Sequence, residues 1–172
     1  DTQLFFLINH LPHNFFLDYF FGALSFIGEY GIIWFFLTLL LSLKYQPQKR
    51  WSFVAKIYLA GFFSLLLVFF LKEIFRRTRP EFVLQNVILP FGPDTSFSFP
   101  SGHALMSFVF VFQLVQFVKL DKFAKTTVYT LAVLISFSRI YLGYHYPLDT
   151  VGGAVIGIIV TKIALRVLAI RK

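Results

Sequence analysis

Cysteine is absent from this chain of 172 residues, and charged side chains make up only 14% of it. Without cysteine, disulfides and thiolate metal sites are excluded. Soluble globular domains carry about 25% charged residues. The low charge, with 58% hydrophobic and 20% aromatic residues, therefore excludes an ordinary water-soluble domain and indicates a membrane protein.

The hydrophobic residues are gathered in long runs that end at charged or helix-breaking residues. Five runs stand out: 31–43, 52–71, 104–118, 126–137 and 148–169. A helix needs roughly 20 apolar residues to cross the hydrocarbon of a bilayer. We therefore expect an all-α fold, a polytopic membrane helix bundle of about five transmembrane helices, or six, in a single domain over residues 1–172.

The residues before the first run have their own expected structure. A further apolar stretch, 15–26, precedes it, and Gly28, Glu29 and Gly31 between the two predict a bend. Residues 1–13 contain His10 and His13 in an aromatic-rich, amphipathic pattern, which predicts a helix lying in the membrane interface. We interpret both histidines as ordinary interfacial residues.

The formal net charge of +8 comes from Lys and Arg at the edges of the apolar runs, a pattern unlike a nucleic-acid-binding surface. If each run crosses the membrane once, 11 of the 16 Lys and Arg share one side: Lys44, Lys49, Arg50, Lys56, Lys119, Lys122, Lys125, Lys162, Arg166, Arg171 and Lys172. The positive-inside rule makes that side, with the C-terminus, cytoplasmic.

The other face receives fewer cations, together with the long polar segment 73–102. Its cations are Lys72, Arg76, Arg77, Arg79 and Arg139. Cations gathered on the face that is usually depleted of them repel one another unless an anion lies among them. We expect an anionic substrate on this extracytoplasmic face.

The first motif lies at the outer end of run 52–71. Lys72, Arg76 and Arg79 follow one another at spacings of four and three, which places them near one face if the helix continues to Pro80. Such a cluster can also be a set of snorkelling side chains that ends a span.

The second motif, Pro100-Ser101-Gly102-His103, runs directly into an apolar segment. Ser101 suits the N-cap, and the free amides of the first turn make a niche for an anion. Taken alone, the pattern is more often an ordinary helix cap.

The third motif begins at Ser138 and Arg139 and ends at Asp149. Pro147 suits the first position of a helix, so His145 stands at its mouth with Asp149 one turn inside, close enough to accept a proton from the ring. A structural His-Asp pair is the alternative.

All three motifs fall on one predicted face and supply complementary parts of one reaction. They resemble the three-part signature of the type-2 phosphatidic acid phosphatase superfamily, which also includes the vanadium haloperoxidases. The matching positions follow the signature in order: Lys72-x6-Arg79-Pro80, Pro100-Ser101-Gly102-His103 and Ser138-Arg139-x5-His145-x3-Asp149. Membrane members of this family usually have six spans, and we expect this chain to lack the first.

The resemblance implies catalytic roles for three residues. His145 is the nucleophile that forms a phosphohistidine, Asp149 orients it, and His103 is the acid and base. The phosphate oxygens are held by a further set: Lys72, Arg79, Ser101, Gly102 and Arg139. Arg76 and Arg77 lie outside the signature, and we expect headgroup contact or a structural role from them.

No metal and no cofactor are expected, because the outer carboxylates and histidines show no metal-ligand spacing. The glycines at 152, 153 and 157 predict close approach of the last helix to its neighbours.

The resemblance implies an enzyme of a bacterial cytoplasmic membrane that hydrolyses a cell-envelope lipid phosphate: lipid A 1-phosphate, undecaprenyl pyrophosphate or phosphatidylglycerophosphate. The sequence does not separate these three. A non-catalytic lipid-binding or transport relative of the same fold is the alternative, and a soluble haloperoxidase fits the composition poorly. Partners other than the lipid and the bilayer are not predicted.

Overall fold

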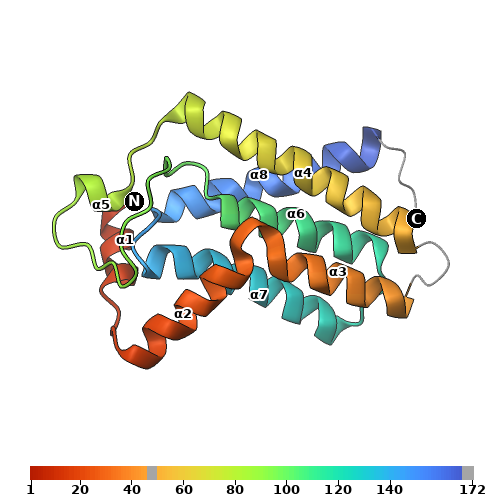
Figure 1. Ribbon diagram of the computed structural model, residues 1–172, viewed down its shortest axis with the longest axis horizontal. Helices are drawn as coiled ribbons and strands as arrows, with labels where there is room; N and C mark the ends of the chain where they lie inside the picture. The colour runs from red at the N-terminus through yellow and green to blue at the C-terminus, as the bar shows by residue number, and fades with distance from the viewer. Residues whose placement is uncertain (46–49, 168–172) are drawn as a thin grey trace.

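The computed structural model describes residues 1–45 and 50–167, and in them every regular element is a helix. Five helices, α3, α4, α6, α7 and α8, run lengthwise through the molecule, and the short α1 and α5 lie across one end (Figure 1). The elements are α1 (Thr2–Asn9), α2 (Phe15–Gly28), the 3-10 turn η1 (Glu29–Gly31), α3 (Ile32–Tyr45), α4 (Arg50–Phe75), α5 (Pro80–Val83), α6 (Gly102–Phe117), α7 (Lys122–Tyr141) and α8 (Pro147–Val167). The predicted all-α membrane bundle is confirmed.

Among the residues that the structure describes, three stretches are long and apolar enough to cross a membrane: Phe15–Leu41, Val54–Val83 and Pro147–Arg166. A shorter apolar helix, Gly102–Phe117, lies among them. The predicted bend before the first run is present, since Tyr30 and Gly31 adopt φ values of 49° and 79° and break the long stretch into α2 and α3. The number of spans, five or six, stays a prediction.

Helix α6 is the centre of the bundle. Leu105, Val109 and Leu114 on it are fully buried, and the indole of Trp34 on α3 donates to the hydroxyl of Ser107 over 3.0 Å. A helix that is apolar on all sides needs neighbours on all sides. Helix α6 is therefore held in place from all sides, and the residues of its first turn have a fixed position.

Two glycines allow α8 to lie directly against α6. A Cβ on Gly153 would come within 2.6 Å of the Ser101 carbonyl oxygen, and one on Gly157 within 2.6 Å of the Leu105 carbonyl oxygen. No real Cβ tolerates such distances, so only glycine permits this contact of two backbones. The predicted packing role of these glycines is confirmed.

Helix α1 closes the end of the bundle at which the three motifs meet (Figure 1). Its buried Asn9 donates from Nδ2 to the carbonyl oxygens of Ile88 and Tyr141, both over 2.9 Å, and accepts the Ile88 amide over 2.9 Å. The helix is thus tied to the polar loop and to the end of α7. Its predicted place in the membrane interface stays a prediction.

One local prediction was wrong. Helix α4 ends at Phe75, before Pro80, because Arg76 adopts a φ of 43° that a helix does not allow. Pro80 instead begins α5, and Arg79 precedes it with extended backbone. Lys72, Arg76 and Arg79 therefore do not share one helix face.

Lys49, Arg171 and Lys172, which were assigned to the cytoplasmic side, lie outside the described residues.

Candidate active site

The guanidinium of Arg79 is buried at the end of the bundle and bonded on every nitrogen. Nε donates to the Ser96 carbonyl over 2.6 Å, Nη1 to the Tyr144 carbonyl over 2.7 Å, and Nη2 to the Asp94 carboxylate over 2.7 Å. These acceptors come from two separate loops. Arg79 is thereby held in one orientation, with Nη1 3.5 Å from Nε2 of His145.

Lys72 reaches the same place from the last turn of α4. Its ammonium donates to the Ser96 hydroxyl over 3.0 Å and to the Phe97 carbonyl oxygen. Loop 94–98 therefore holds Lys72 and Arg79 close together, although the two residues do not lie on one helix face.

His145 and Asp149 are joined through a third residue. Their closest atoms, Nδ1 and Oδ2, are 3.7 Å apart, too far for a hydrogen bond. The Ser98 hydroxyl lies between them, 3.4 Å from Nδ1 and 2.5 Å from Oδ2. The predicted His-Asp pair is therefore present at ion-pair distance but without a direct hydrogen bond, and Oδ2 accepts instead from Ser98 and from the Tyr146 amide at 2.9 Å.

This relay assigns the protons on the His145 ring. A carboxylate only accepts, so the Ser98 hydroxyl donates to Asp149 and its oxygen is free to accept from Nδ1–H. Nε2 then carries the lone pair, and it faces the Arg79 guanidinium. Burial, followed by the charges of Arg79, Arg139 and Lys72, holds the pKa of His145 well below its ordinary value. The lowered pKa favours the neutral form of the side chain.

The second carboxylate oxygen of Asp149 is bound by a residue outside the signature. Arg77 Nη1 donates to Asp149 Oδ1 over 2.6 Å. Arg77 thus positions Asp149, which favours the structural alternative for this residue. Arg76 is exposed and pairs with Glu73 over 3.2 Å, away from the other cations.

The first turn of α6 supplies the remaining predicted residues. Ser101 occupies the N-cap, as predicted, but its side chain makes no capping bond. His103 Nε2 lies 3.1 Å from the Ser25 carbonyl oxygen, which can only accept, so Nε2 carries a proton. The Ser25 hydroxyl accepts Arg139 Nη1 over 2.6 Å, so one residue of α2 touches both His103 and Arg139.

Three buried side-chain atoms in and around this site have no hydrogen-bond partner among the described residues: Ser101 Oγ, Arg139 Nε and Oε2 of Glu81, whose other oxygen accepts the Asp94 amide. The first two can donate, whereas the Glu81 oxygen only accepts. Buried donors are rarely left unpaired in proteins, and an exception calls for an explanation. A bound anion would supply the missing acceptor.

The Asp94 carboxylate lies where such an anion would be expected. Its Oδ2 accepts from Arg79 Nη2 at 2.7 Å and is 3.5 Å from Arg139 Nη2. Burial alone would raise the pKa of Asp94, but the Ser96 amide and the two arginines more than offset it, and the pKa lies below its usual range. Asp94 is therefore an anion that neutralises the two guanidinium groups.

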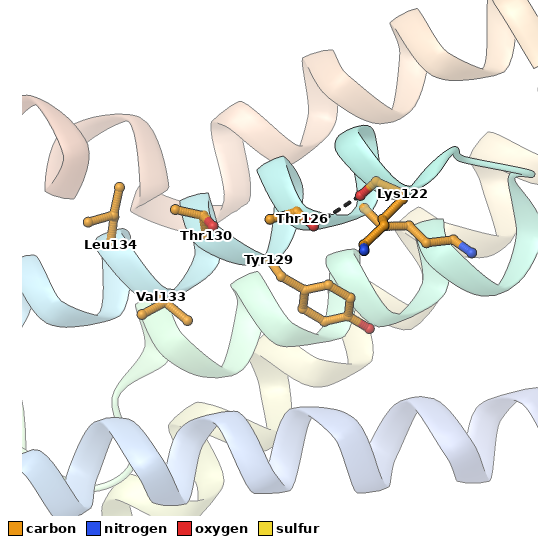
Figure 2. A pocket seen from close by; sticks show the side chains of 7 residues that line it. Lys122, Thr126, Tyr129, Thr130, Val133 and Leu134 are labelled. Carbon is orange, nitrogen blue, oxygen red and sulfur yellow. Dashed lines mark hydrogen bonds between the residues drawn. The ribbon is translucent and has the colours of Figure 1, made fainter.

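Of these groups, Asp94, His103 and Arg139 border a hollow of about 310 Å³, which we call the phosphate hollow, whereas Lys72, Arg79 and His145 are not among its lining residues. It is lined by Ser25, Glu29, Pro93, Asp94, Thr95, His103, Arg139 and Tyr144. A larger hollow of about 560 Å³, the α7 hollow, lies apart from it and is lined by Lys122, Lys125, Thr126, Tyr129, Thr130, Val133 and Leu134 (Figure 2). All of these come from one helix, so the α7 hollow brings no separate segments together.

Comparison with known proteins decides the family. The sequence profile of the PAP2 superfamily matches residues 49–172, which is most of the chain. The chain belongs to the PAP2 superfamily. The family expected from the three motifs is therefore confirmed.

PAP2 relatives are similar to this chain in both sequence and structure. The crystal structure of Aquifex aeolicus LpxE superposes with a TM-score of 0.81 at 35% identity, over 96% of this chain and 94% of that one. The lipid A 4'-phosphatase of Bacteroides thetaiotaomicron is 31% identical over 170 residues, 91% of this chain and 72% of the relative. Phosphatidylglycerophosphatase B of Bacillus subtilis is 33% identical over 120 residues, but the match spans only 56% of its length.

Within this PAP2 site, Arg79 lies near His145 and shares Asp94 with Arg139, and Lys72 shares Ser96 with Arg79. The Ser101 amide donates to the Asp149 carbonyl oxygen, and His103 shares Ser25 with Arg139. Among the further residues that contact them, the sequence reasoning missed Ser25, Asp94, Ser96 and Ser98. Asp94 and Ser98 lie in the polar loop that was expected to carry function, but their positions in it gave no signal. Ser25 is one polar residue in an apolar helix, which is the only sign of its role in the sequence.

Proposed function

We propose that this protein is an integral-membrane lipid phosphatase that hydrolyses the phosphate ester or pyrophosphate of a cell-envelope lipid without a metal ion. The observation that carries the proposal is the position of His145 Nε2, 3.5 Å from the buried guanidinium of Arg79. A neutral nucleophile beside fixed cations is what phosphoryl transfer requires, because this reaction depends mainly on positioning and on charge stabilisation.

The phosphate binds among the cations. Its non-bridging oxygens take the place of the Asp94 carboxylate on Arg79 and Arg139 and also receive Lys72. The Ser101 hydroxyl and the amides of the first turn of α6 complete the site, since the positive end of a helix favours an anion.

The reaction has two steps. His145 Nε2 attacks phosphorus, the bond from phosphorus to the lipid oxygen breaks, and His103 in its protonated form gives the proton on Nδ1 to the departing oxygen, which leaves a neutral ring with the Nε2 proton still on the Ser25 carbonyl oxygen. Water then attacks the phosphohistidine, His103 takes a proton from it, and the bond from nitrogen to phosphorus breaks to release inorganic phosphate. Ser98 and Asp149 stabilise the charge that the His145 ring gains in the first step.

The substrate class follows from the relatives. The lipid A 4'-phosphatase and the phosphatidylglycerophosphatase are named for lipid phosphates of bacterial envelopes, and an undecaprenyl-diphosphatase of Bacillus subtilis is 29% identical over 160 residues. We propose a substrate among these lipids. By the predicted topology, the site would lie on the extracytoplasmic face of the membrane, next to the lipids of the outer leaflet.

The test is phosphate release by the purified protein and by its His145→Ala variant, with chelator present throughout. The panel contains lipid A, undecaprenyl pyrophosphate and phosphatidylglycerophosphate. Release by the parent protein alone supports the proposal, and the ranking of the lipids identifies the substrate. If the parent releases nothing from any lipid, the protein is a non-catalytic relative. A loss under chelator that added divalent metal restores would overturn the metal-independent mechanism.

A further inference from the structure

The phosphate hollow lies on the leaving-group side of the proposed reaction. His103, the proposed proton donor, lines the hollow together with Arg139, whereas the proposed nucleophile His145 is not among its lining residues. The oxygen that His103 protonates is the departing one. The chemical group that carries this oxygen therefore extends into the phosphate hollow, and the walls of the hollow select among leaving groups.

Glu29 is an acidic residue on this wall that the proposed mechanism does not use. It follows Ser25 by four residues, a spacing that places two side chains on one helix face, and both residues line the hollow. A Cβ on the preceding Gly28 would lie 3.4 Å from Cδ2 of the His103 ring, so the chain passes directly against the proposed acid. Glu29 is half-buried, and its carboxylate forms no hydrogen bond or ion pair with the residues that the structure describes.

The backbone is bent at this point, and the bend sets the position of Glu29. Glu29 itself has an extended ψ of 132°, and Tyr30 adopts a φ of 49°, which is uncommon for a large side chain. The Tyr30 side chain is 67% exposed, so packing of its ring does not explain this conformation. The next residue, Gly31, lies against α6, where a Cβ would come within 3.0 Å of the Phe110 ring. Strained backbone that the surrounding structure holds in place is frequent at functional sites.

The charges on the wall treat two kinds of leaving group differently. The lining residues include two carboxylates, Glu29 and Asp94, and the guanidinium of Arg139, which binds the transferred phosphate in the proposed reaction. In a pyrophosphate the departing oxygen belongs to a second phosphate, which would lie beside the Glu29 carboxylate, and like charges placed together weaken binding. In a phosphate monoester, a hydroxyl or amide N–H next to the departing oxygen would instead donate to this free carboxylate.

We propose that Glu29 is a specificity-determining residue, which favours phosphate monoesters with a hydroxyl or amide N–H beside the phosphate over pyrophosphates. This inference rests on the proposed phosphatase function and narrows its substrate class. Phosphatidylglycerophosphate, with a glycerol hydroxyl, and lipid A 1-phosphate, with an amide, belong to the favoured class. Undecaprenyl pyrophosphate belongs to the disfavoured one.

The experiment measures kcat/KM of the parent protein and of Glu29→Gln for phosphatidylglycerophosphate and for undecaprenyl pyrophosphate in the same detergent. The substitution removes the charge and keeps the size and one acceptor oxygen. For the pyrophosphate, kcat/KM should rise about threefold to fivefold, the effect of one charge at a partly exposed site. For the monoester it should fall about twofold to threefold, because a neutral acceptor binds a hydroxyl less strongly than a charged one.

A soluble pair of inhibitors tests the same contact without a lipid chain. In Glu29→Gln, the inhibition constant of inorganic pyrophosphate should fall about threefold to fivefold relative to that of inorganic phosphate. Glu29→Asp keeps the charge and should keep the parental preference within about twofold. The matched control is Glu73→Gln, which removes an exposed carboxylate outside the hollow and should leave both preferences within about twofold.

A parent protein that prefers undecaprenyl pyrophosphate would overturn the proposed selectivity. Equal changes for the two lipids in Glu29→Gln, no change for either, or the same shift in Glu73→Gln would also overturn it. A parent protein that releases no phosphate from any lipid would instead overturn the proposed function, and that result is visible before any variant is made.

Discussion

The phosphate hollow and the α7 hollow both contain cations, yet only one of them is built as an anion site. At the α7 hollow, Lys122 and Lys125 are exposed and come from a single helix (Figure 2). At the phosphate hollow, the buried Arg139 lines the space, and the buried Arg79, from a different part of the chain, is joined to it through Asp94. The α7 hollow is the larger, at about 560 Å³ against about 310 Å³.

The difference teaches that neither the volume of a hollow nor the number of cations beside it makes an active site. A flexible, hydrated ammonium must be ordered when an anion binds, whereas Arg79 is already fixed by its acceptors. Pre-organised charge is also what lowers the barrier in phosphoryl transfer. Four substitutions test this comparison.

Replacing Arg79 by Lys should have the largest effect. Arg79→Lys keeps the charge but loses the planar fork that the Ser96 and Tyr144 carbonyls orient. We expect kcat/KM to fall about 10² to 10³-fold in a phosphate-release assay. Arg76→Lys, at an exposed neighbouring arginine, is the control and should stay within about twofold. Equal activity of the two variants would mean that charge alone suffices.

Removing the Ser98 hydroxyl should have the next largest effect. In Ser98→Ala the ring of His145 loses its link to Asp149, so the imidazole is less well oriented and its charge is less stabilised in the first step. We expect kcat to fall roughly tenfold to a hundredfold, with little change in KM. Ser98→Thr keeps a hydroxyl and should restore much of the rate, and an unaffected Ala variant would show that the relay is not used.

Neutralising Asp94 should have a smaller effect of the opposite sign. Asp94→Asn removes the carboxylate that competes with phosphate for Arg79 and Arg139. The inhibition constant of inorganic phosphate should fall roughly threefold to fivefold, since a partly exposed ion pair is worth up to about 1 kcal/mol. Glu73→Gln, at an exposed carboxylate, should not change it. Weaker phosphate inhibition in Asp94→Asn would mean that Asp94 holds the arginines in place for the substrate.

The smallest effect is expected at the α7 hollow. The double variant Lys122→Ala, Lys125→Ala should keep kcat/KM within about twofold and the free energy of unfolding within about 0.5 kcal/mol, because both side chains are exposed. Phosphate release and thermal unfolding in detergent measure the two quantities. A tenfold loss of activity would show that this end of the bundle takes part in substrate binding.

The sequence predicted those features that depend on local backbone chemistry. Pro147 begins α8, Ser101 occupies the N-cap of α6, and the glycines of α8 lie against α6, all as expected. The placement of the three motifs at the same end of the bundle was also predictable. Each membrane-crossing run connects the two ends of the bundle, so the order of the runs assigns each motif to one end.

Contacts between distant polar residues could not be predicted. Ser25 is 114 residues from Arg139 in sequence and Ser98 is 47 from His145, and neither spacing reflects a helical or extended period. The end of α4 was misplaced because Pro80 is a strong stop signal, while the positive φ of Arg76 depends on tertiary contacts. The residue at which a helix ends therefore depends partly on the tertiary contacts of the segment that follows it.

The contact between α6 and α8 has a mechanical consequence. The Ser101 amide donates to the Asp149 carbonyl oxygen over 3.0 Å, so the first turns of the two helices are joined by backbone as well as by the glycine contact. When the bilayer thickens or thins, or its lateral pressure changes, we expect α6 and α8 to tilt together as one rigid unit. His103 and His145 lie at the beginnings of these two helices, so we expect the distance between them to change little with the physical state of the surrounding membrane.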